Sequence, residues 1–307
     1  MLTRRMAIAA LAAGLGRQAL AGQSAPLAAT PGAAATPPEA APDLVDLAYS
    51  DRSPRNLLDL RRPPGSGPCP VFLDIHGGGF LTGDKRQLRA PAAVVAQGIA
   101  VARMNYRLSD QARWPAQQED VLTAIDWLRA HATGLGLRAD RIAVGGHSAG
   151  AFLALSAALS LVAAGRPPAA VVDFYGPTDF GSMDNDMARL GLPVSRRPAD
   201  SPRSVESLLV GYAVGERRDA ARAMGPVGQL ARMDPGTDLP ALMIRHGTAD
   251  RIVAVGQAER LRSAWAEVDP GAEIDIALLA GEGHGTAGFA APATRQALAA
   301  FLARHLL

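Results

Sequence analysis

Three polar segments of the sequence carry residue types that could together cleave an ester or amide bond. Ser148 stands between Gly146 and Gly150 in GHSAG, while Asp250 and His284 come later, in HGTAD and GEGHG. A serine hydroxyl is too weakly acidic to attack a carbonyl carbon unaided, so it needs an imidazole to remove its proton and a carboxylate to orient that imidazole. We therefore predict Ser148 as the nucleophile, His284 as the general base and acid, and Asp250 as the orienting carboxylate.

The GHSAG segment lies where a strand would pass into a helix. An apolar run over 141–145 precedes it, and a helix-like run over 152–159 follows it. A nucleophile elbow requires this context, because flanking glycines let the serine adopt a strained backbone that lifts its hydroxyl above a sheet. A dinucleotide-binding loop is excluded, since Ser148 stands where that motif needs its second glycine. The alternative is that these glycines only form an ordinary turn between a strand and a helix. The later segments HGTAD and GEGHG argue against this alternative, because they supply the Asp and His that a serine nucleophile needs.

The segment HGGGF, residues 76–80, follows a predicted strand over 71–75. Three consecutive glycines expose backbone N–H groups and let a substrate approach closely, which suits an oxyanion hole. A phosphate-binding loop is excluded because Asp84-Lys85 stands where that motif has Lys followed by Ser or Thr, and Asp84 would repel a phosphate. Phe80, which ends the segment, is predicted to contact the substrate.

His284 is favoured as the base because it lies in a glycine-flanked loop after the last predicted strand. His147 neighbours Ser148, but its side chain should point elsewhere from such a tight turn, so we expect it to support the structure. Asp250 is favoured as the acid because it follows the next-to-last predicted strand, and Asp179 in YGPTD is the alternative. The chain order Ser, Asp, His is that of α/β-hydrolases. We predict no metal site and no cofactor, since no two histidines are spaced i, i+4 and no cysteine pair exists.

The elements that must position these residues alternate along most of the chain. Short apolar runs are typical of strands buried on both faces, and stretches with helical periodicity lie between them. This alternation predicts an α/β protein with a mostly parallel sheet of about eight strands and helices on both faces. Leu44–Tyr49 and Asn56–Leu60 are predicted to form an antiparallel edge, because a turn at 51–54 joins them. The buried strands are expected at 71–75, 99–104, 142–144, 170–174, 241–244 and 274–279, and the helices at 91–97, 116–131, 149–163, 255–268 and 292–306.

One long gap interrupts the alternation between Asp179 and Asp238, after the sixth strand. We predict a small cap or lid over a pocket in this gap. Ordinary surface helices with an apolar inner stripe are the alternative. The apolar side chains that would line the cap are Met183, Met187, Leu190, Leu192, Leu208 and Leu209.

The composition is that of a globular chain, since 48% of the 307 residues are hydrophobic and 20% are charged. The net charge of +2 comes from arginines scattered along the chain without long basic runs, so we expect no nucleic-acid partner. The single cysteine, Cys69, permits no internal disulfide and is expected to be a buried structural residue.

The N-terminal residues have the features of an export signal. Residues 1–21 contain Arg4-Arg5, an apolar stretch from Met6 to Leu15, and Ala19-Leu20-Ala21, which fits a small-x-small cleavage site. The apolar stretch is too short to span a bilayer, so no membrane span is predicted. The arginine pair favours the twin-arginine route, with the general secretory route and an amphipathic first helix as alternatives. We expect a periplasmic or secreted protein, with an Ala/Pro-rich flexible linker over 22–43 and a catalytic domain over 44–307.

Seven segments, in their order along the chain, resemble the carboxylesterase branch of the α/β-hydrolase family that includes bifunctional feruloyl and acetyl xylan esterases. They are HGGGF, NYRLS with WPAQQEDVLTAIDWLRAHA, GGHSAGAFLAL, FYGPTDF, SVESLLVG, HGTAD and GEGHG. The likeness covers essentially everything after Leu44. It implies an α/β-hydrolase fold, and an oxyanion hole made by the backbone N–H groups of Gly78, Gly79 and Ala149.

The resemblance also implies a structural role for Trp114-Pro115 and Asp120, which match a segment packed beneath the site. The chain departs from the family at Ala151, where a third glycine is common, and at MGPVGQLA, where a stretch with Ser-Pro is usual. The second departure changes the predicted pocket wall, on which the choice of substrate depends.

Together, the residues and the resemblance predict an exported serine carboxylic-ester hydrolase that acts through an acyl-enzyme. Its expected substrates are short-acyl or aryl esters, including acetylated or feruloylated polysaccharide. A serine peptidase of the same fold is one alternative, although no clear acidic pair is present to bind a peptide amino terminus. A non-catalytic binding protein on this fold is the other.

Overall fold

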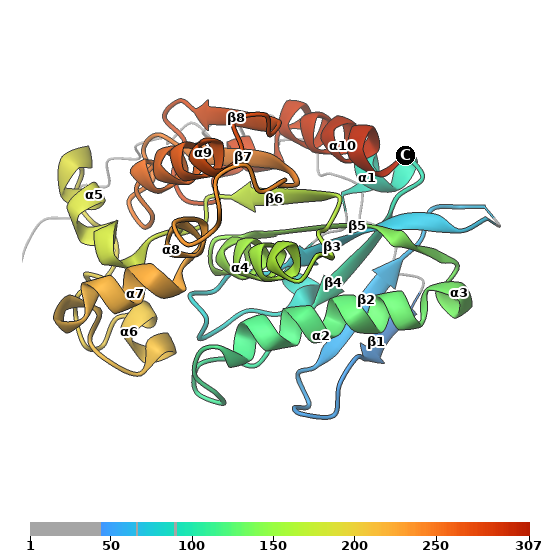
Figure 1. Cartoon of the computed structure of the whole chain (residues 1–307), viewed down its shortest axis with the longest axis horizontal. Helices are drawn as coiled ribbons and strands as arrows, with labels where there is room; N and C mark the ends of the chain where they lie inside the picture. Colours follow the sequence, from blue (N-terminus) through green and yellow to red (C-terminus); the bar gives the residue numbers. More distant parts are fainter. Residues whose placement is uncertain (1–43, 66, 89–90) are drawn as a thin grey trace, which may run out of the picture. The chain divides into compact units, whose positions relative to one another are not determined.

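The fold is built around one mixed β-sheet (Figure 1). The computed structural model describes residues 44–65, 67–88 and 91–307, so the predicted export signal (1–21) and linker (22–43) lie outside the described residues. In this part of the chain the sheet has eight strands in the order β1-β2-β4-β3-β5-β6-β7-β8. Their bounds are β1 Leu44–Ala48, β2 Leu57–Arg61, β3 Cys69–Ile75, β4 Ala100–Met104, β5 Leu137–His147, β6 Ala170–Phe174, β7 Ala241–Gly247 and β8 Ile274–Leu279.

The strand directions bring the predicted polar segments to one edge of the sheet. β1 and β2 pair antiparallel, as predicted, and β2 also pairs antiparallel with β4. From β4 onward every neighbouring pair is parallel. The segments with Gly78, Ser148, Asp250 and His284 follow the carboxyl ends of β3, β5, β7 and β8. They therefore share the edge where ligand sites of open α/β sheets form.

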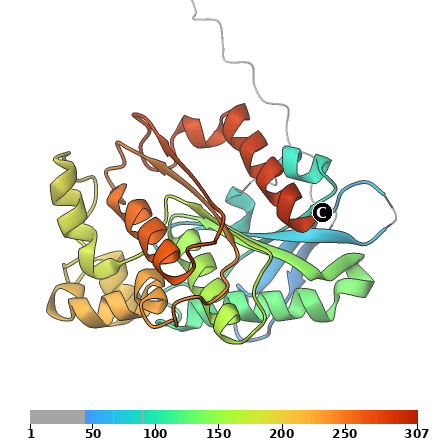
Figure 2. The ribbon, with the colours of Figure 1, turned by 45° about the horizontal axis from the view of Figure 1, so that its top comes forward.

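Helices cover both faces of the sheet, as the alternation predicts (Figure 2). α1 and α10 lie together on one face, where Phe72 and Val172 of the sheet pack against them. α2, α4 and α9 contribute to the larger core on the other face, which includes the fully buried Trp265. The bounds of the helices that cover the sheet are α1 Ala92–Ala96, α2 Ala116–Ala130, α3 Ala132–Leu135, α4 Ala149–Ala163, α9 Gly256–Val268 and α10 Pro292–Leu306.

β8 departs from the prediction that the apolar runs are strands buried on both faces. Every residue from Ile274 to Leu279 keeps part of its surface in solvent, and Leu278 is exposed. β8 is the last strand of the sheet order, so it has one strand neighbour instead of two. An apolar run identifies a strand but does not determine whether that strand is central or at an edge.

The gap in the alternation is filled by short helices between β6 and β7. Figure 1 shows α5, α6 and α7 grouped on the side where β6 ends. The prediction of a small insertion after the sixth strand is confirmed. Four α-helices, α5 Met183–Leu190, α6 Val205–Val210, α7 Arg218–Met224 and α8 Pro226–Leu230, occupy it in the described chain.

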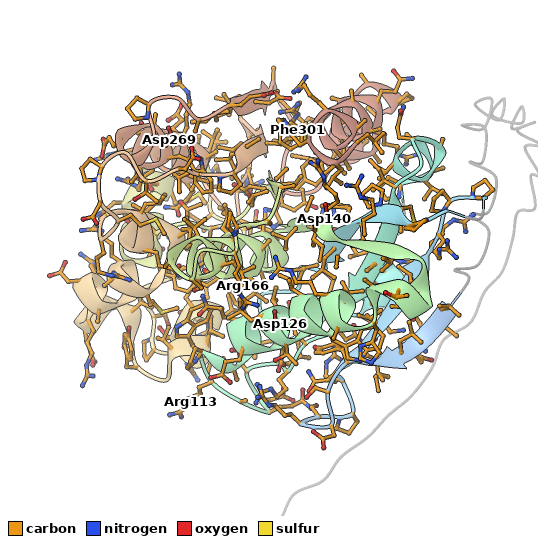
Figure 3. The ribbon with its side chains drawn as sticks, turned by 45° about the vertical axis from the view of Figure 1, so that its right-hand side comes forward. Arg113, Asp126, Asp140, Arg166, Asp269 and Phe301 are labelled. Atoms are coloured by element: carbon orange, nitrogen blue, oxygen red, sulfur yellow. The ribbon has the colours of Figure 1, made fainter. Side chains whose placement is uncertain are left out.

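Ion pairs with Arg107 and Arg166 link α2 to its surroundings. Arg107 donates to the buried Asp120 side chain from Nε at 3.0 Å, which agrees with the structural role expected for Asp120. Arg166 Nη1 donates to Asp126 Oδ1 at 2.9 Å and so connects the end of α4 to α2 (Figure 3). None of the helices in the described ranges combines the length and the apolar composition needed to span a lipid bilayer.

Candidate active site

Ser148 occupies the turn between β5 and α4. Its backbone φ is +54°, in the left-handed region that residues with a side chain rarely adopt. The turn depends on its two glycines, because a Cβ at Gly150 would lie 2.1 Å from the Ile75 carbonyl oxygen, and one at Gly146 would lie 2.5 Å from the Gly150 carbonyl carbon. The conformation of Ser148 and the close backbone approach around it have the geometry of a nucleophile elbow.

Ser148, His284 and Asp250 form one line of hydrogen bonds. His284 Nε2 lies 2.8 Å from Ser148 Oγ, and His284 Nδ1 lies 2.7 Å from Asp250 Oδ2. An ionised carboxylate only accepts hydrogen bonds, so Nδ1 carries the proton and donates to Asp250. Nε2 is then free to accept from the Ser148 hydroxyl, which is the tautomer that a general base requires. The structure brings together the three residues that the sequence singles out.

Asp250 is fully buried, and its second oxygen is held by the backbone. The N–H groups of Ile252 and Val253 donate to Oδ1 at 2.8 and 2.9 Å. His246 lies below, with Nε2 3.6 Å from Asp250 Oδ2 and 2.9 Å from the Val253 carbonyl oxygen. Burial lowers the pKa of His246, which favours its neutral form. These contacts leave Asp250 Oδ2 oriented toward His284.

Asp179, the alternative acid, has other partners. Its Oδ2 accepts a hydrogen bond from Arg222 Nε at 2.9 Å, and its backbone N–H donates to Gln257 at 2.8 Å. Within the described part of the chain, Asp179 forms no hydrogen bond or ion pair with His284. The geometry therefore favours Asp250 over Asp179.

The glycine loop after β3 passes beside Ser148. A Cβ at Gly77 would lie 3.1 Å from the Ser148 Cβ. Gly78 and Gly79 have φ values of +112° and +59°, which glycine adopts without the strain that a side chain would bring. The N–H groups of Gly78, Gly79 and Ala149 donate no hydrogen bond to any residue in the described ranges. They are therefore free to donate to a bound ligand.

Phe80 ends the glycine loop, with a φ of +62°. Its ring is only 1% exposed, and it packs edge-on against Phe152 and Phe180 with ring centroids 5.6 and 6.0 Å apart. Trp114 packs against the same Phe152 at 5.4 Å. The structure thus places the Phe80 side chain in the hydrophobic core, and its contact with a substrate stays a prediction.

Tyr175 lies against His284 and was missed by the sequence reasoning. The two rings pack edge to face with centroids 4.7 Å apart, and Tyr175 has a φ of +48°. The Tyr175 hydroxyl lies 3.3 Å from His147 Nδ1, and His147 Nε2 lies 3.4 Å from Asp74 Oδ1. His147 therefore belongs to a second line of polar contacts, in keeping with the supporting role expected for it. The available signal was that Tyr175 directly follows β6, at the same edge of the sheet.

Burial raises the pKa of two groups near this second line, the Tyr175 hydroxyl and the Asp173 carboxyl group. Burial raises the pKa of Tyr175, and the nearby charges of Asp74 and Asp250 raise it further. Burial also raises the pKa of Asp173 to about 7, although the Gly176 N–H, 2.8 Å from Asp173 Oδ1, acts in the opposite direction. Asp173 Oδ2 has no hydrogen-bond partner among the described residues.

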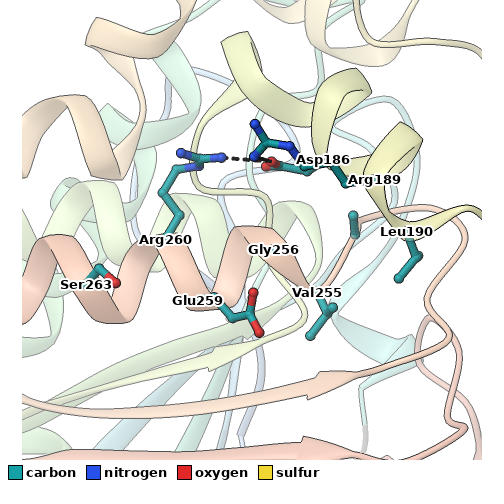
Figure 4. A pocket seen from close by; sticks show the side chains of 9 residues that line it. Asp186, Arg189, Leu190, Val255, Gly256, Glu259, Arg260 and Ser263 are labelled. Atoms are coloured by element: carbon teal, nitrogen blue, oxygen red, sulfur yellow. Dashed lines mark hydrogen bonds and ion pairs between the residues drawn. The ribbon is translucent and has the colours of Figure 1, made fainter.

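A hollow of about 370 Å³ between α5 and α9 lies apart from these residues (Figure 4). Arg260 crosses it and donates from Nη2 to Asp186 Oδ1 at 2.8 Å. Its lining contains neither Ser148 nor His284, so we do not place the substrate there. In the ranges that the structure describes, no group of three or more His, Cys, Asp and Glu side chains is arranged to hold a metal ion.

The sheet order, the serine turn after β5 and the later Asp and His define the α/β-hydrolase fold. The chain belongs to the BD-FAE family, whose model matches residues 58–265. The resemblance noted from the sequence is thereby confirmed at the level of the family.

Comparison with known proteins agrees with this family and fold. The chain is 31% identical over 228 residues to "Probable carboxylic ester hydrolase LipM" of Mycobacterium tuberculosis, a match that covers 69% of this chain and 49% of LipM. The chain spans about half the length of the curated relatives it matches. A solved structure described as a truncated carbohydrate esterase from gut microbiota has a TM-score of 0.73 and 24% identity, covering 85% of this chain and 95% of that one. A bifunctional GH43-CE protein of Bacteroides eggerthii has a TM-score of 0.70 and 23% identity, covering 86% and 35%.

Proposed function

We propose that this protein is an exported serine hydrolase of carboxylic esters that acts through an acyl-enzyme. The observation that carries the proposal is the line from Ser148 Oγ through His284 to Asp250, with bonds of 2.8 and 2.7 Å, beside unoccupied backbone donors. The names of relatives such as LipM support the ester specificity. The support for export is the arginine pair, apolar stretch and cleavage pattern within residues 1–21.

In the proposed reaction, Ser148 Oγ attacks the ester carbonyl carbon while His284 Nε2 takes the hydroxyl proton. The carbonyl oxygen becomes an oxyanion that accepts hydrogen bonds from the N–H groups of Gly78, Gly79 and Ala149. The tetrahedral intermediate collapses, and the departing alkoxide receives the proton from His284. Water then gives a proton to His284 and attacks the acyl carbon, and Ser148 leaves with that proton. Asp250 stabilises the imidazolium that forms in both halves.

We propose short-acyl or aryl esters as the substrate class, with acetyl or feruloyl groups on polysaccharide as the natural form. The support is the family match together with the resemblance of the sequence segments to feruloyl and acetyl xylan esterases. A substrate inferred at the level of a family requires a direct assay.

The test compares the wild-type protein with Ser148→Ala on p-nitrophenyl acetate. We expect the variant to lose activity by at least about 10⁴-fold and to keep its melting temperature, because the hydroxyl is the nucleophile. Ser156→Ala is a matched control, since Ser156 lies in α4, the helix that directly follows Ser148, is buried, and has no hydrogen-bond partner for Oγ among the described residues. Full activity in Ser148→Ala would refute the assignment.

A second assay separates the alternatives of peptidase and binding protein. We expect the wild-type protein to hydrolyse acetyl esters much faster than aminoacyl anilides, and a fluorophosphonate probe to label Ser148. Faster cleavage of the anilides would favour a peptidase. Absence of both turnover and labelling would favour a non-catalytic binding protein.

A further inference from the structure

We propose that Val205, the first residue of α6, is the wall that limits the size of the acyl group. This inference rests on the proposed function, and it adds a specificity-determining residue that lies outside the Ser148, His284 and Asp250 line. It assigns the insertion between β6 and β7 a defined task, which is to select, within the proposed substrate class, esters of short acids such as acetate over esters of large acids such as ferulate.

The position of Val205 is fixed by its neighbour in the glycine loop. A Cβ built at Gly79 would have three near neighbours, and all three are atoms of the Val205 side chain, at 3.2, 3.5 and 3.5 Å. Gly79 is one of the proposed oxyanion donors, so the apolar side chain of Val205 packs against a residue of the proposed oxyanion hole. Val205 is half-buried, which leaves part of its surface free to contact a substrate.

The sheet order indicates which half of the ester meets Val205. Gly79 follows β3 on one side of β5, whereas His284 follows β8, which lies beyond β6 and β7 on the other side. The leaving oxygen must lie within reach of His284 Nε2, because that atom protonates it. The oxyanion points at the backbone donors, so the acyl substituent takes the remaining direction, away from His284. That direction leads toward Gly79 and Val205.

Helix α6, which carries Val205, is held by hydrogen bonds at its first turn and at its last. Ser204 Oγ caps α6 by accepting from the Ser207 N–H at 3.0 Å, and it donates to the Ala199 carbonyl oxygen at 2.7 Å. At the other end, the Trp114 N–H donates to the Leu209 carbonyl oxygen at 3.0 Å. A side chain on a helix fixed at both ends cannot swing aside at low cost, so it can discriminate by size.

A buried ion pair links the same helix to the loop that carries Asp250. Arg196 Nη1 donates to Glu206 Oε1 at 3.1 Å, and Arg196 Nε donates to the Ile252 carbonyl oxygen at 2.7 Å. Glu206 is only 3% exposed. Ile252 is also the residue whose N–H holds Asp250 Oδ1 at 2.8 Å. The wall and the orienting carboxylate are therefore positioned by one connected set of contacts.

The experiment measures kcat/KM for p-nitrophenyl acetate, butanoate and hexanoate and for a feruloyl ester, using the full-length protein. We expect the wild-type protein to prefer acetate. Val205→Ala should raise the hexanoate-to-acetate ratio by about 10-fold or more, because one methylene in a tight apolar pocket changes specificity by roughly 10- to 200-fold. Val205→Phe should lower the butanoate-to-acetate ratio. Val162→Ala is the matched control, a half-buried valine in the last turn of α4, and should leave the profile unchanged.

A second series, acetate esters of alcohols of increasing length, tests the direction of the wall. We expect Val205→Ala to leave this alcohol profile within about 2-fold of wild type. A shift confined to the alcohol series would place Val205 beside the leaving group and overturn the proposal, as would an unchanged acyl profile in both Val205 variants. Either result would leave the proposed function intact, provided that wild-type acetate hydrolysis is present. A wild-type protein that does not hydrolyse p-nitrophenyl acetate would instead refute the proposed function.

Discussion

His284 Nε2 lies 2.8 Å from Ser148 Oγ, although 136 residues of chain separate the two. The serine follows β5 and the histidine lies in the loop after β8, and two strands, β6 and β7, lie between β5 and β8 in the sheet. The parallel strands bring both loops to one edge of the sheet.

Asp250→Asn should lower kcat for p-nitrophenyl acetate by about 10³- to 10⁴-fold without unfolding the protein. The amide cannot stabilise an imidazolium, yet its oxygen can still accept the Ile252 and Val253 N–H bonds that hold Asp250. The measurement is steady-state kinetics on samples with matched circular dichroism. Asp179→Asn is the control and should keep kcat within about 10-fold, and the opposite ranking of the two variants would make Asp179 the acid.

The two histidines near Ser148 should behave differently on substitution. His284→Gln should lose at least about 10³-fold in kcat, because it removes the group within 2.8 Å of the nucleophile. His147→Gln should keep kcat within about 10-fold, since His147 contacts Tyr175 and Asp74 instead. Single-turnover assays of both variants measure this difference. Comparable losses in both would give His147 a direct part in the chemistry.

Gly150→Ala should destabilise the protein by about 3 kcal/mol or more, because the new Cβ would meet the Ile75 carbonyl oxygen at 2.1 Å and backbone cannot yield as a side chain does. Gly134→Ala is the matched control. Gly134 lies in α3 with nothing within 4 Å of its Cβ position, so alanine there should be neutral or stabilise by about 0.5–1 kcal/mol. Urea denaturation measures both values, and equal stabilities would contradict the close approach at the turn.

Asp173→Asn should become more stabilising, relative to wild type, as the pH rises from 5 to 8. The pKa of Asp173 is raised by burial to about 7, so the folded state keeps a proton that the unfolded state releases near the ordinary pKa of 3.8. The unfolded state therefore binds fewer protons over this range, and the wild-type free energy of unfolding falls with pH until about 7. Asparagine does not titrate, and its oxygen can still accept the Gly176 N–H.

Thermal unfolding at pH 5, 6, 7 and 8 measures this difference. The melting temperature of Asp173→Asn minus that of wild type should increase up to about pH 7 and then level off. Asp219→Asn, at a fully exposed carboxyl group, should show a constant difference. A constant offset for Asp173→Asn would mean that Asp173 is already ionised across this range.

Much of the fold could be predicted from the sequence, because the apolar patterns that indicate its helices and strands are local. The strand and helix runs at 170–174, 274–279, 149–163 and 292–306 coincide with β6, β8, α4 and α10. Apolar periodicity and chain order reflect burial, which is also what drives the elements to form. The exposure of β8 could not be predicted from the sequence, because a central strand and an edge strand differ in which strands lie beside them in the sheet.

The sequence by itself determined which residue types could form the site, since GHSAG, HGTAD and GEGHG name a serine, an aspartate and a histidine in one order. Tertiary structure decided the rest. It paired His284 with Asp250 instead of Asp179, buried the Phe80 ring in the core, and set Tyr175 against His284 and Val205 against Gly79. These contacts join residues far apart in the chain, and no local pattern encodes them, because they depend on how the strands are ordered and where the helices between β6 and β7 pack.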